Sequence, residues 1–387
     1  MGGRIAARSG LVLAGLLLAF VVCEAGLRVA GPRVPGIADL TTIATFQTYH
    51  PTFGFFHRPG ATAWIHTSEF TSFVQINSRG LRDREIPYEK PAAVRRVLLL
   101  GDSIVEGSQV PLEQTIAKRL EARIQLAGTV NVQVINAGNA GFGTAQELLF
   151  LEQEGVRYAP DVVVLVYYVD NDVADNGYAL SLERKLDVRR RPFFVPDGSG
   201  GLKLLPIVAP ASDAWEGAKS TARSWSMLYG IGETVALREQ QRDQENQQIG
   251  KNRPTYLIEP PAEWQESWWV TERLIPRVRD AAERMGARFV LVVAPANYQV
   301  SDEAWRSLMG GEAADRARRY DREVPNRRIQ AVTAAAGIAT LDLLPAMRAV
   351  PAASDVYFPE DGHWTAAGHD LAAAELYRYL VGLGALR

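Results

Sequence analysis

Short apolar runs alternate with longer amphipathic segments in two stretches of the chain, a pattern typical of β/α units. Nearly continuous apolar runs predict buried parallel strands at 95–100, 131–136, 161–169, 288–294 and 338–343. The segments between them predict helices at 112–127, 144–154, 271–285, 326–336 and 365–383. Right-handed crossovers between such units give a parallel five-stranded sheet with helices on both faces.

Two local signals bear on the helix boundaries. Thr144 followed three residues later by Glu147 predicts a capping box at the start of the second helix, and Gly155 predicts its end. We expect a helix from Thr271, but Pro276 makes its exact start uncertain. Proline is tolerated in the first turn of a helix but not in its interior.

The β/α alternation stops after Asn176 and resumes at Thr271. Because the same alternation continues on both sides, we interpret residues of about 178–270 as an insertion after the third strand of one domain, 93–387. Residues 31–92 are rich in proline, glycine, threonine and aromatic residues, which predicts a lead-in of short strands and loops.

The N-terminal segment is apolar. Gly10–Cys23 carries no charged residue and follows Arg4 and Arg8. Extended to residue 30, the segment approaches the roughly 20 residues that cross a bilayer, so we expect residues 1–30 to be a signal-anchor with a cytoplasmic N-terminus. A signal peptide cleaved after Ala25 and a buried helix are the alternatives. In the first two cases the rest of the chain lies outside the cytoplasm.

Composition and residue spacing bear on the expected partners and cofactors. A formal net charge of −2, with 47% hydrophobic and 22% charged residues, indicates an ordinary globular protein and disfavours nucleic acid as a partner. Cys23 is the only cysteine, so no intramolecular disulfide or multi-cysteine zinc site can form. His50, His57 and His66 lack metal-ligand spacing. We therefore expect neither a metal nor another cofactor.

A serine stands where the first predicted strand ends, in Gly101-Asp102-Ser103. Open parallel sheets bind ligands at the carboxyl ends of their strands, so a serine there faces a substrate. Near the other end of the chain, Asp361 precedes His363 by two residues. A serine that is deprotonated by a histidine, itself oriented by a carboxylate, is a nucleophile for acyl transfer. Taken alone, Ser103 is better interpreted as a helix N-cap, the commonest role of a serine at a strand-to-helix turn.

The segment from Gly101 to Gly107, Gly-Asp-Ser-Ile-Val-Glu-Gly, is not the Gly-x-Ser-x-Gly turn of α/β-hydrolases. It resembles the first sequence block of the GDSL or SGNH hydrolase family. Asn136–Gly141, Asp170–Asp172 and the segment around His363 resemble the later blocks, in the order that the family uses them. The resemblance implies a three-layer α/β/α, flavodoxin-like SGNH hydrolase fold for about half of the chain, 94–176 and 288–383.

The resemblance also implies roles for single residues. Ser103 matches the nucleophile and His363 the general base, while the backbone amides of Ser103 and Gly141 and the side chain of Asn171 match the oxyanion hole. Gly141 and Asn171 also fit tight turns, which glycine and asparagine favour for conformational reasons alone. His369 is an alternative base that we interpret as structural.

The carboxylate that orients His363 has more than one candidate. Many family members carry the sequence Asp-x-x-His, and this chain departs from it. Here Glu360 stands three residues before His363, and Asp361 stands two before it. The form Asp-x-His-Trp resembles a variant in SGNH-like proteins that work on bacterial polysaccharides, including alginate O-acetyltransferases. We therefore assign the acid to Asp361, with Glu360 and Asp355 as alternatives.

These residues predict a serine ester hydrolase that acts on carboxylic (acyl or acetyl) esters of a small molecule or a glycan through an acyl-serine intermediate. An O-acetyltransferase that modifies an exported polysaccharide is the alternative, and it would need a partner to supply the acyl donor. A non-catalytic binding protein on the same scaffold is the third possibility. In each case we expect a membrane-anchored, extracytoplasmic domain.

Overall fold

The computed structural model describes residues 2–30, 47–128, 130–184, 186, 188, 191–208, 218, 222, 225–232, 235, 252–310 and 319–386. The chain divides into two compact units, Met1–Phe46 with Pro210–Asn246 and Gln47–Ala209 with Gln247–Arg387. The first part of the predicted lead-in, 31–46, and much of the predicted insertion lie outside the described residues.

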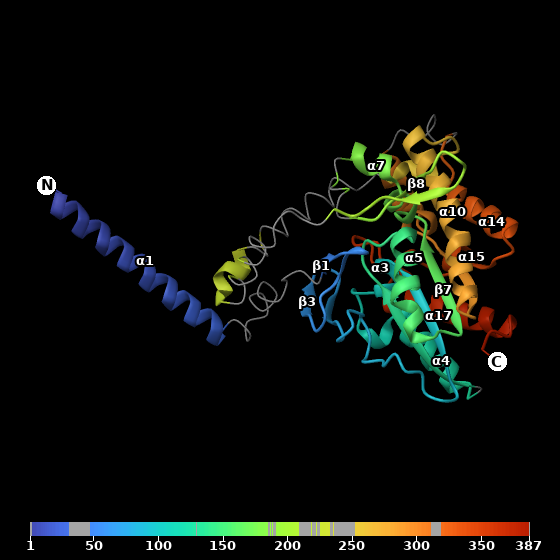
Figure 1. Ribbon diagram of the computed structural model, residues 1–387, viewed down its shortest axis with the longest axis horizontal. Coiled ribbons are helices and arrows are strands. Elements are labelled where there is room, and N and C mark those ends of the chain that lie inside the picture. The colour runs from blue at the N-terminus through green and yellow to red at the C-terminus, as the bar shows by residue number, and fades with distance from the viewer. Residues whose placement is uncertain are drawn as a thin grey trace. The chain divides into compact units, whose positions relative to one another are not determined.

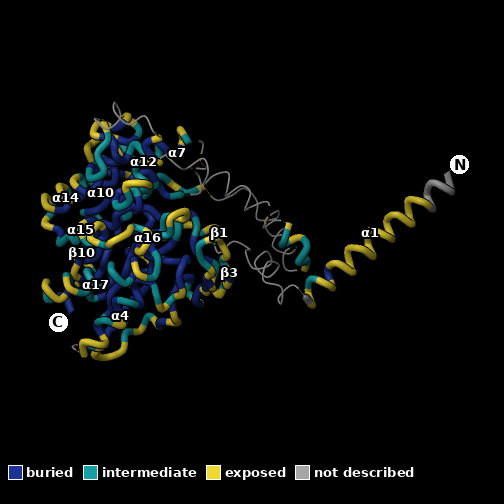
Figure 2. The backbone as a smooth tube through the Cα atoms, turned by 180° about the vertical axis from the view of Figure 1, so that it is seen from behind, coloured by how far each residue is buried: buried dark blue, intermediate teal, exposed yellow. Residues whose placement is uncertain are grey.

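The first unit contains one long helix, α1 (Gly2–Ala30). Its segment Arg8–Val29 has a mean hydropathy of 2.3 and is long and apolar enough to cross a membrane. Figure 2 shows this helix exposed along most of its described length. By length and composition, α1 therefore fits a membrane anchor or a signal sequence.

The second unit is built around the predicted five-stranded parallel sheet (Figure 1), which is confirmed. Its strands, in the spatial order β11-β10-β7-β5-β6, are β5 (Val94–Gly101), β6 (Asn131–Gly138), β7 (Val162–Tyr168), β10 (Arg288–Ala294) and β11 (Ala339–Asp342). Along β5, Leu98 and Leu100 pack into the core on one face, and Val97 and Leu99 pack into the core on the other. Burial on both faces explains the unbroken apolar runs in the sequence.

Helices cover both faces, so the predicted three-layer arrangement is also confirmed. One core includes residues of α5 (Thr144–Gln153), α10 (Ala262–Arg284) and α14 (Val324–Ala335). The other includes residues of α4 (Ile116–Leu126), α15 (Leu344–Arg348) and α17 (Ala366–Gly382). The remaining short helices are α3 (Ser103–Glu106), α6 (Asp172–Asp175), α7 (Tyr178–Glu183), α11 (Asn297–Val300), α12 (Asp302–Met309), α16 (Ala353–Val356), η2 (Leu112–Gln114), η3 (Gly155–Tyr158) and η5 (Arg253–Tyr256).

Two boundary predictions are wrong. Helix α10 begins at Ala262, nine residues before the predicted start, and Pro276 lies in its interior. The apolar face continues upstream through Trp264 and Trp268, which are buried against the sheet, and this packing stabilises the extra turns. The cap of α5 is Gly143 instead of Thr144, as described with the site below.

Two antiparallel hairpins precede the sheet, and a third lies in the insertion. The first pairs β1 (Gln47–His50) with β2 (Gly54–His57), and the second pairs β3 (Thr62–His66) with β4 (Thr71–Gln75). The third pairs β8 (Phe194–Pro196) with β9 (Leu202–Leu204).

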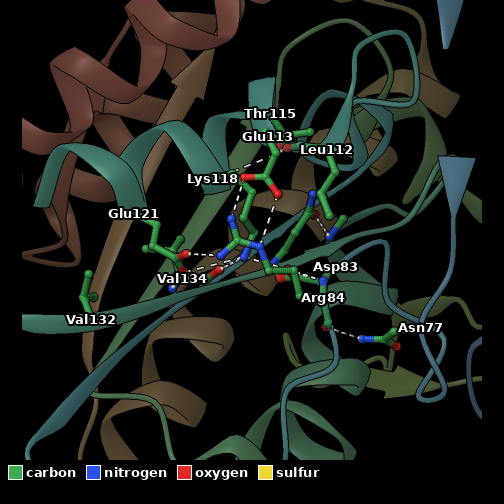
Figure 3. Close-up of polar contacts among 12 residues, drawn as sticks. Asn77, Asp83, Arg84, Leu112, Glu113, Thr115, Lys118, Glu121, Val132 and Val134 are labelled. Atoms are coloured by element: carbon green, nitrogen blue, oxygen red, sulfur yellow. Dashed lines mark hydrogen bonds and ion pairs between the residues drawn. The ribbon is translucent and has the colours of Figure 1, made fainter. Parts of the chain in front are cut away.

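One buried ion pair and two partly exposed ones join the segment after the β3–β4 hairpin to the α/β core (Figure 3). The ammonium of Lys118 on α4 lies 2.6 Å from the carboxylate of Asp83, and both side chains are almost fully buried. Arg84 pairs with Glu113 and with Glu121. Burial raises the pKa of Asp83, and the charge of Lys118 opposes that effect. The lead-in from residue 47 onward is therefore part of the same packed unit as the sheet.

Candidate active site

Ser103 is the first residue of the short helix α3, directly after the carboxyl end of β5. The N-cap of this helix is Asp102, whose Oδ1 accepts a hydrogen bond of 2.9 Å from the amide of Ile104. Because Asp102 satisfies the cap, the hydroxyl of Ser103 is available for another partner. Gly138 on β6 permits the close approach of α3, since a Cβ there would lie 2.1 Å from the amide nitrogen of Glu106.

The structure brings Ser103, His363 and Asp361 together. The Oγ of Ser103 lies 2.8 Å from Nε2 of His363, and Nδ1 of His363 lies 2.7 Å from Oδ1 of Asp361. With the ring proton on Nδ1 donated to the carboxylate, Nε2 is free to accept the serine proton. This is the hydroxyl–imidazole–carboxylate order that a serine nucleophile needs.

The electrostatics of the pair favour a charged carboxylate beside a basic imidazole. Burial lowers the pKa of His363, but the hydrogen bond and charge of Asp361 outweigh it, and the pKa lies above its ordinary value. Burial raises the pKa of Asp361, yet its hydrogen bond with His363 and the charge of that ring hold it below the usual range. The two side chains remain 26% and 25% exposed, so solvent reaches the pair.

The other candidates for acid and base have different partners. The carboxylate of Glu360 accepts a hydrogen bond from the hydroxyl of Ser68, and Asp355 accepts one from the amide of Ala352. His369 is buried and accepts a hydrogen bond from the amide of Ile116 through Nδ1, and burial lowers its pKa to about 3. Within the part of the chain that the structure describes, Asp361 is the carboxylate hydrogen-bonded to His363.

The two residues predicted to complete the oxyanion hole, Gly141 and Asn171, follow β6 and β7. Gly141 has a φ of +80°, a conformation that favours glycine. Both residues line one cavity of about 360 Å³. The rest of its lining consists of Phe55, Ala174, Asp175, Ser181, Arg184, Leu186, Val188, Arg191, Phe193 and Asn252.

An arginine from the insertion links Gly141 and Asn171. One guanidinium nitrogen of Arg191 donates to the carbonyl oxygen of Gly141. The other donates to Oδ1 of Asp175 at 2.7 Å and to its carbonyl oxygen at 3.1 Å. The second carboxylate oxygen of Asp175 accepts a hydrogen bond of 2.9 Å from the side-chain amide Nδ2 of Asn171. Sequence reasoning missed Arg191 and Asp175, since no local motif marks either.

Three carboxyl groups are buried beneath the site. Asp102, Glu147 and Asp172 are all at most 1% exposed. Burial raises the pKa of Asp102 to about 6 and raises the pKa values of Glu147 and Asp172 well above their ordinary values, with the neighbouring carboxylates adding to the effect. The predicted role of Glu147 in a capping box is wrong, because Gln146 accepts the hydrogen bond from the amide of Gly143.

Glu106, three residues after Ser103, connects α3 with the loop that carries Gly141. Its Oε2 accepts a hydrogen bond of 2.6 Å from the amide of Ala140 and lies 3.0 Å from Nε2 of the buried His57. Arg82 donates to the carbonyl oxygens of Glu106 and of the next residue. The lead-in thus contributes to the placement of the α3 helix of Ser103 relative to the predicted oxyanion loop.

The turn between β3 and β4 contacts the loop that precedes His363. The carboxylate of Glu69 accepts hydrogen bonds from the amides of Glu360, at 2.9 Å, and Asp361, at 2.7 Å. The rings of Phe70 and Phe358 lie 5.0 Å apart. Glu69 was not found from the sequence, because nothing local distinguishes it from any other turn glutamate.

The C-terminal part of the chain matches a known family. Residues 259–382 match the family described as "SGNH hydrolase-like domain, acetyltransferase AlgX". This segment includes β10, β11, Asp361 and His363. No curated protein matches the chain.

Several solved structures have a similar fold. A lipase/acylhydrolase from Enterococcus faecalis is 16% identical, with 75% of this chain and 96% of that one covered and a TM-score of 0.37. An esterase from Pseudoalteromonas sp. is 11% identical, with coverages of 75% and 98% and a TM-score of 0.37. An acetyl-xylooligosaccharide esterase from Geobacillus is 10% identical, with coverages of 74% and 94% and a TM-score of 0.40.

The family match covers the last block, and the three earlier blocks lie at the carboxyl ends of β5, β6 and β7 in the family's order. The five-stranded parallel sheet between two helical layers is the architecture that the blocks imply. The match over residues 259–382 and the architecture of the sheet therefore support an SGNH/GDSL hydrolase family for this chain.

Proposed function

We propose that the protein is a serine esterase that cleaves carboxylic esters through an acyl intermediate on Ser103. The observation that carries the proposal is the continuous chain of hydrogen bonds from Ser103 Oγ through His363 to Asp361, with distances of 2.8 and 2.7 Å.

Each proton in the proposed reaction has a defined carrier. Nε2 of His363 takes the proton of Ser103 as Oγ attacks the ester carbonyl, and Asp361 stabilises the imidazolium that forms. The amides of Ser103 and Gly141 and the side chain of Asn171 stabilise the tetrahedral oxyanion. Collapse breaks the ester bond, and the leaving alcohol takes the proton from His363. In the second half of the reaction His363 deprotonates a water molecule, which attacks the carbonyl of the acyl-serine. The acid leaves, and His363 returns the proton to Oγ of Ser103.

Transfer of the acyl group to a sugar hydroxyl is a second candidate function. The Asp361-Gly362-His363-Trp364 sequence and the acetyltransferase in the description of the matched family support it. The chemistry differs only in the last step, where a glycan hydroxyl replaces water as the group that His363 deprotonates. An acyl-donor partner would then supply the group that Ser103 carries.

We further propose that α1 anchors the catalytic unit outside the cytoplasm, with Arg4 and Arg8 on the cytoplasmic side. Contacts inside the first unit support an uncleaved anchor. The carboxylate of Glu24 accepts hydrogen bonds from the hydroxyl of Ser226 and from the amides of the next two residues. Cleavage after Ala25 would remove this carboxylate.

The test compares the full-length protein with its Ser103→Ala variant on a short-chain acyl ester, with and without an added glycan. We expect turnover by the wild type and loss of nearly all of it in the variant. Release of free acid supports the esterase, and acyl groups on the sugar support the transferase. Wild-type turnover by Ser103→Ala would overturn both.

A further inference from the structure

The β3–β4 hairpin has one buried face and one exposed face. Ala63 and Val74, which pair across the two strands, point into the protein and are buried. The residues that alternate with them form the outer face, and they are Thr62, Trp64, His66, Thr71, Phe73 and Gln75. In Figures 1 and 2, β3 lies beside β1 at one edge of the second unit.

Three rings form a row on this outer face. Trp64 and Phe73 are directly opposite each other in the register of the hairpin, and their ring centroids lie 5.2 Å apart. Trp64 also stacks on His66, with centroids 5.7 Å apart. Although Trp64 and Phe73 are large and apolar, they are 41% and 43% exposed. The centroid distances of 5.2 and 5.7 Å are close to the spacing of successive units in a pyranose chain, so consecutive sugars could each contact one ring.

The groups around the rings are uncharged hydrogen-bonding groups. Thr62, Thr71 and Gln75 offer two hydroxyls and an amide, and the hydroxyl of Thr71 lies 3.0 Å from Nδ1 of His66. Sugars present C–H faces to aromatic rings and hydroxyls to such polar neighbours. A surface for phosphates or nucleic acid needs lysine or arginine, and this outer face carries neither. Membrane-surface elements are rich in the same basic residues.

The same hairpin contacts the candidate active site. Its turn, Thr67–Phe70, carries Glu69, which binds the amides of Glu360 and Asp361. Ser68 donates to the carboxylate of Glu360 at 2.8 Å. The strand that carries Trp64 and His66 therefore leads into a turn that contacts the loop of Asp361.

We propose that the outer face of the β3–β4 hairpin is a carbohydrate-binding surface that takes a neutral, pyranose-based chain along the Phe73–Trp64–His66 row. Binding there holds a glycan substrate beside the loop of Asp361 and His363. This consequence for catalysis rests on the proposed function, whereas the binding itself does not.

Binding is tested on the full-length protein in detergent by calorimetry, with cellohexaose and xylohexaose as probes. We expect saturable binding of at least one probe, and a Kd at least about tenfold higher when Trp64→Ala and Phe73→Ala are combined. Trp64→Tyr, which keeps an aromatic ring, should retain most of the affinity. Leu126→Ala is the matched control, because Leu126 is an 87% exposed apolar residue on α4.

The catalytic consequence is tested by the ratio of kcat/KM on acetylated xylan to that on p-nitrophenyl acetate. The ratio should fall about tenfold in the double variant and stay constant in Leu126→Ala. Absence of binding by the wild type, or equal binding by the double variant, overturns the proposal. So does binding of this face to phosphatidylcholine vesicles in place of the sugars. Sugar binding by a protein without esterase activity would instead contradict only the proposed function.

Discussion

Replacement of Arg191 by methionine should lower kcat without unfolding the protein. The guanidinium donates to the carbonyl oxygen of Gly141 and to Asp175, which in turn holds the amide of Asn171. Methionine keeps much of the length of the side chain but removes the charge and every hydrogen bond. Both predicted oxyanion residues would then lose part of their support, and Asp175 would lose its cation.

The expected magnitude follows from the kind of bonds that are lost. A hydrogen bond to a charged group contributes about 1.5–3 kcal/mol. If that support acts mainly in the transition state, kcat falls roughly 10- to 100-fold. This is less than the roughly 10²- to 10³-fold loss on removal of a direct oxyanion donor, because Arg191 acts through other residues. Arg191→Lys keeps the charge and one donor and should lose less.

The assay measures kcat and KM of the full-length protein on a short-chain ester, with and without added guanidinium chloride at a concentration that leaves the fold intact. Guanidinium should restore part of the kcat of Arg191→Met. Arg284→Met is the control, because Arg284 pairs with Glu152 at the surface and should change neither constant. A wild-type kcat in Arg191→Met would refute the reasoning. The reasoning would also be refuted if Arg191→Met lost kcat in parallel with a lower Tm and added guanidinium restored none of it.

Three further predictions concern the acid, its support and the fold. Asp361→Asn should lower kcat by about 10⁴-fold and move the acidic limb of the kcat/KM profile to lower pH, since the imidazole loses the charge that raises its pKa. Glu360→Gln should keep most activity, and the reverse pattern would reassign the acid. Glu69→Gln leaves one of the two backbone amides, of Glu360 or Asp361, without its carboxylate partner. We expect kcat to fall several-fold and the acidic limb of the kcat/KM profile to move to lower pH. An unchanged profile would contradict the role of Glu69 in positioning Asp361. Lys118→Met should cost about 3–5 kcal/mol in denaturant unfolding because Asp83 stays buried without its cation, and a loss below about 1 kcal/mol would disprove that.

The sheet was predictable from the sequence because its strands are buried on both faces. Val97 to Leu100 alternate between two cores, so both faces of this part of β5 are apolar. The start of α10 was not predictable in the same way. Trp264 and Trp268 belong to the helix because they pack against the sheet, and an interior Pro276 argues locally against that extension.

The residues of the candidate site also differ in whether the sequence alone could predict them. Ser103, Asp361 and His363 each stand in a short motif at a strand end or loop, so their sequence neighbours mark them as candidates. Arg191 and Glu69 act on residues 50 and 292 positions away in the chain, and such contacts leave no local pattern. Long-range contacts of this kind become visible only when the fold is known.

Covalent labelling with a fluorophosphonate, followed by peptide mapping, tests most directly whether Ser103 is the activated nucleophile. The 2.8 Å contact with His363 predicts a single adduct on Ser103, its absence in Ser103→Ala and much slower labelling in His363→Ala. An active, ester-cleaving protein whose adduct maps to any other residue would contradict the proposed mechanism.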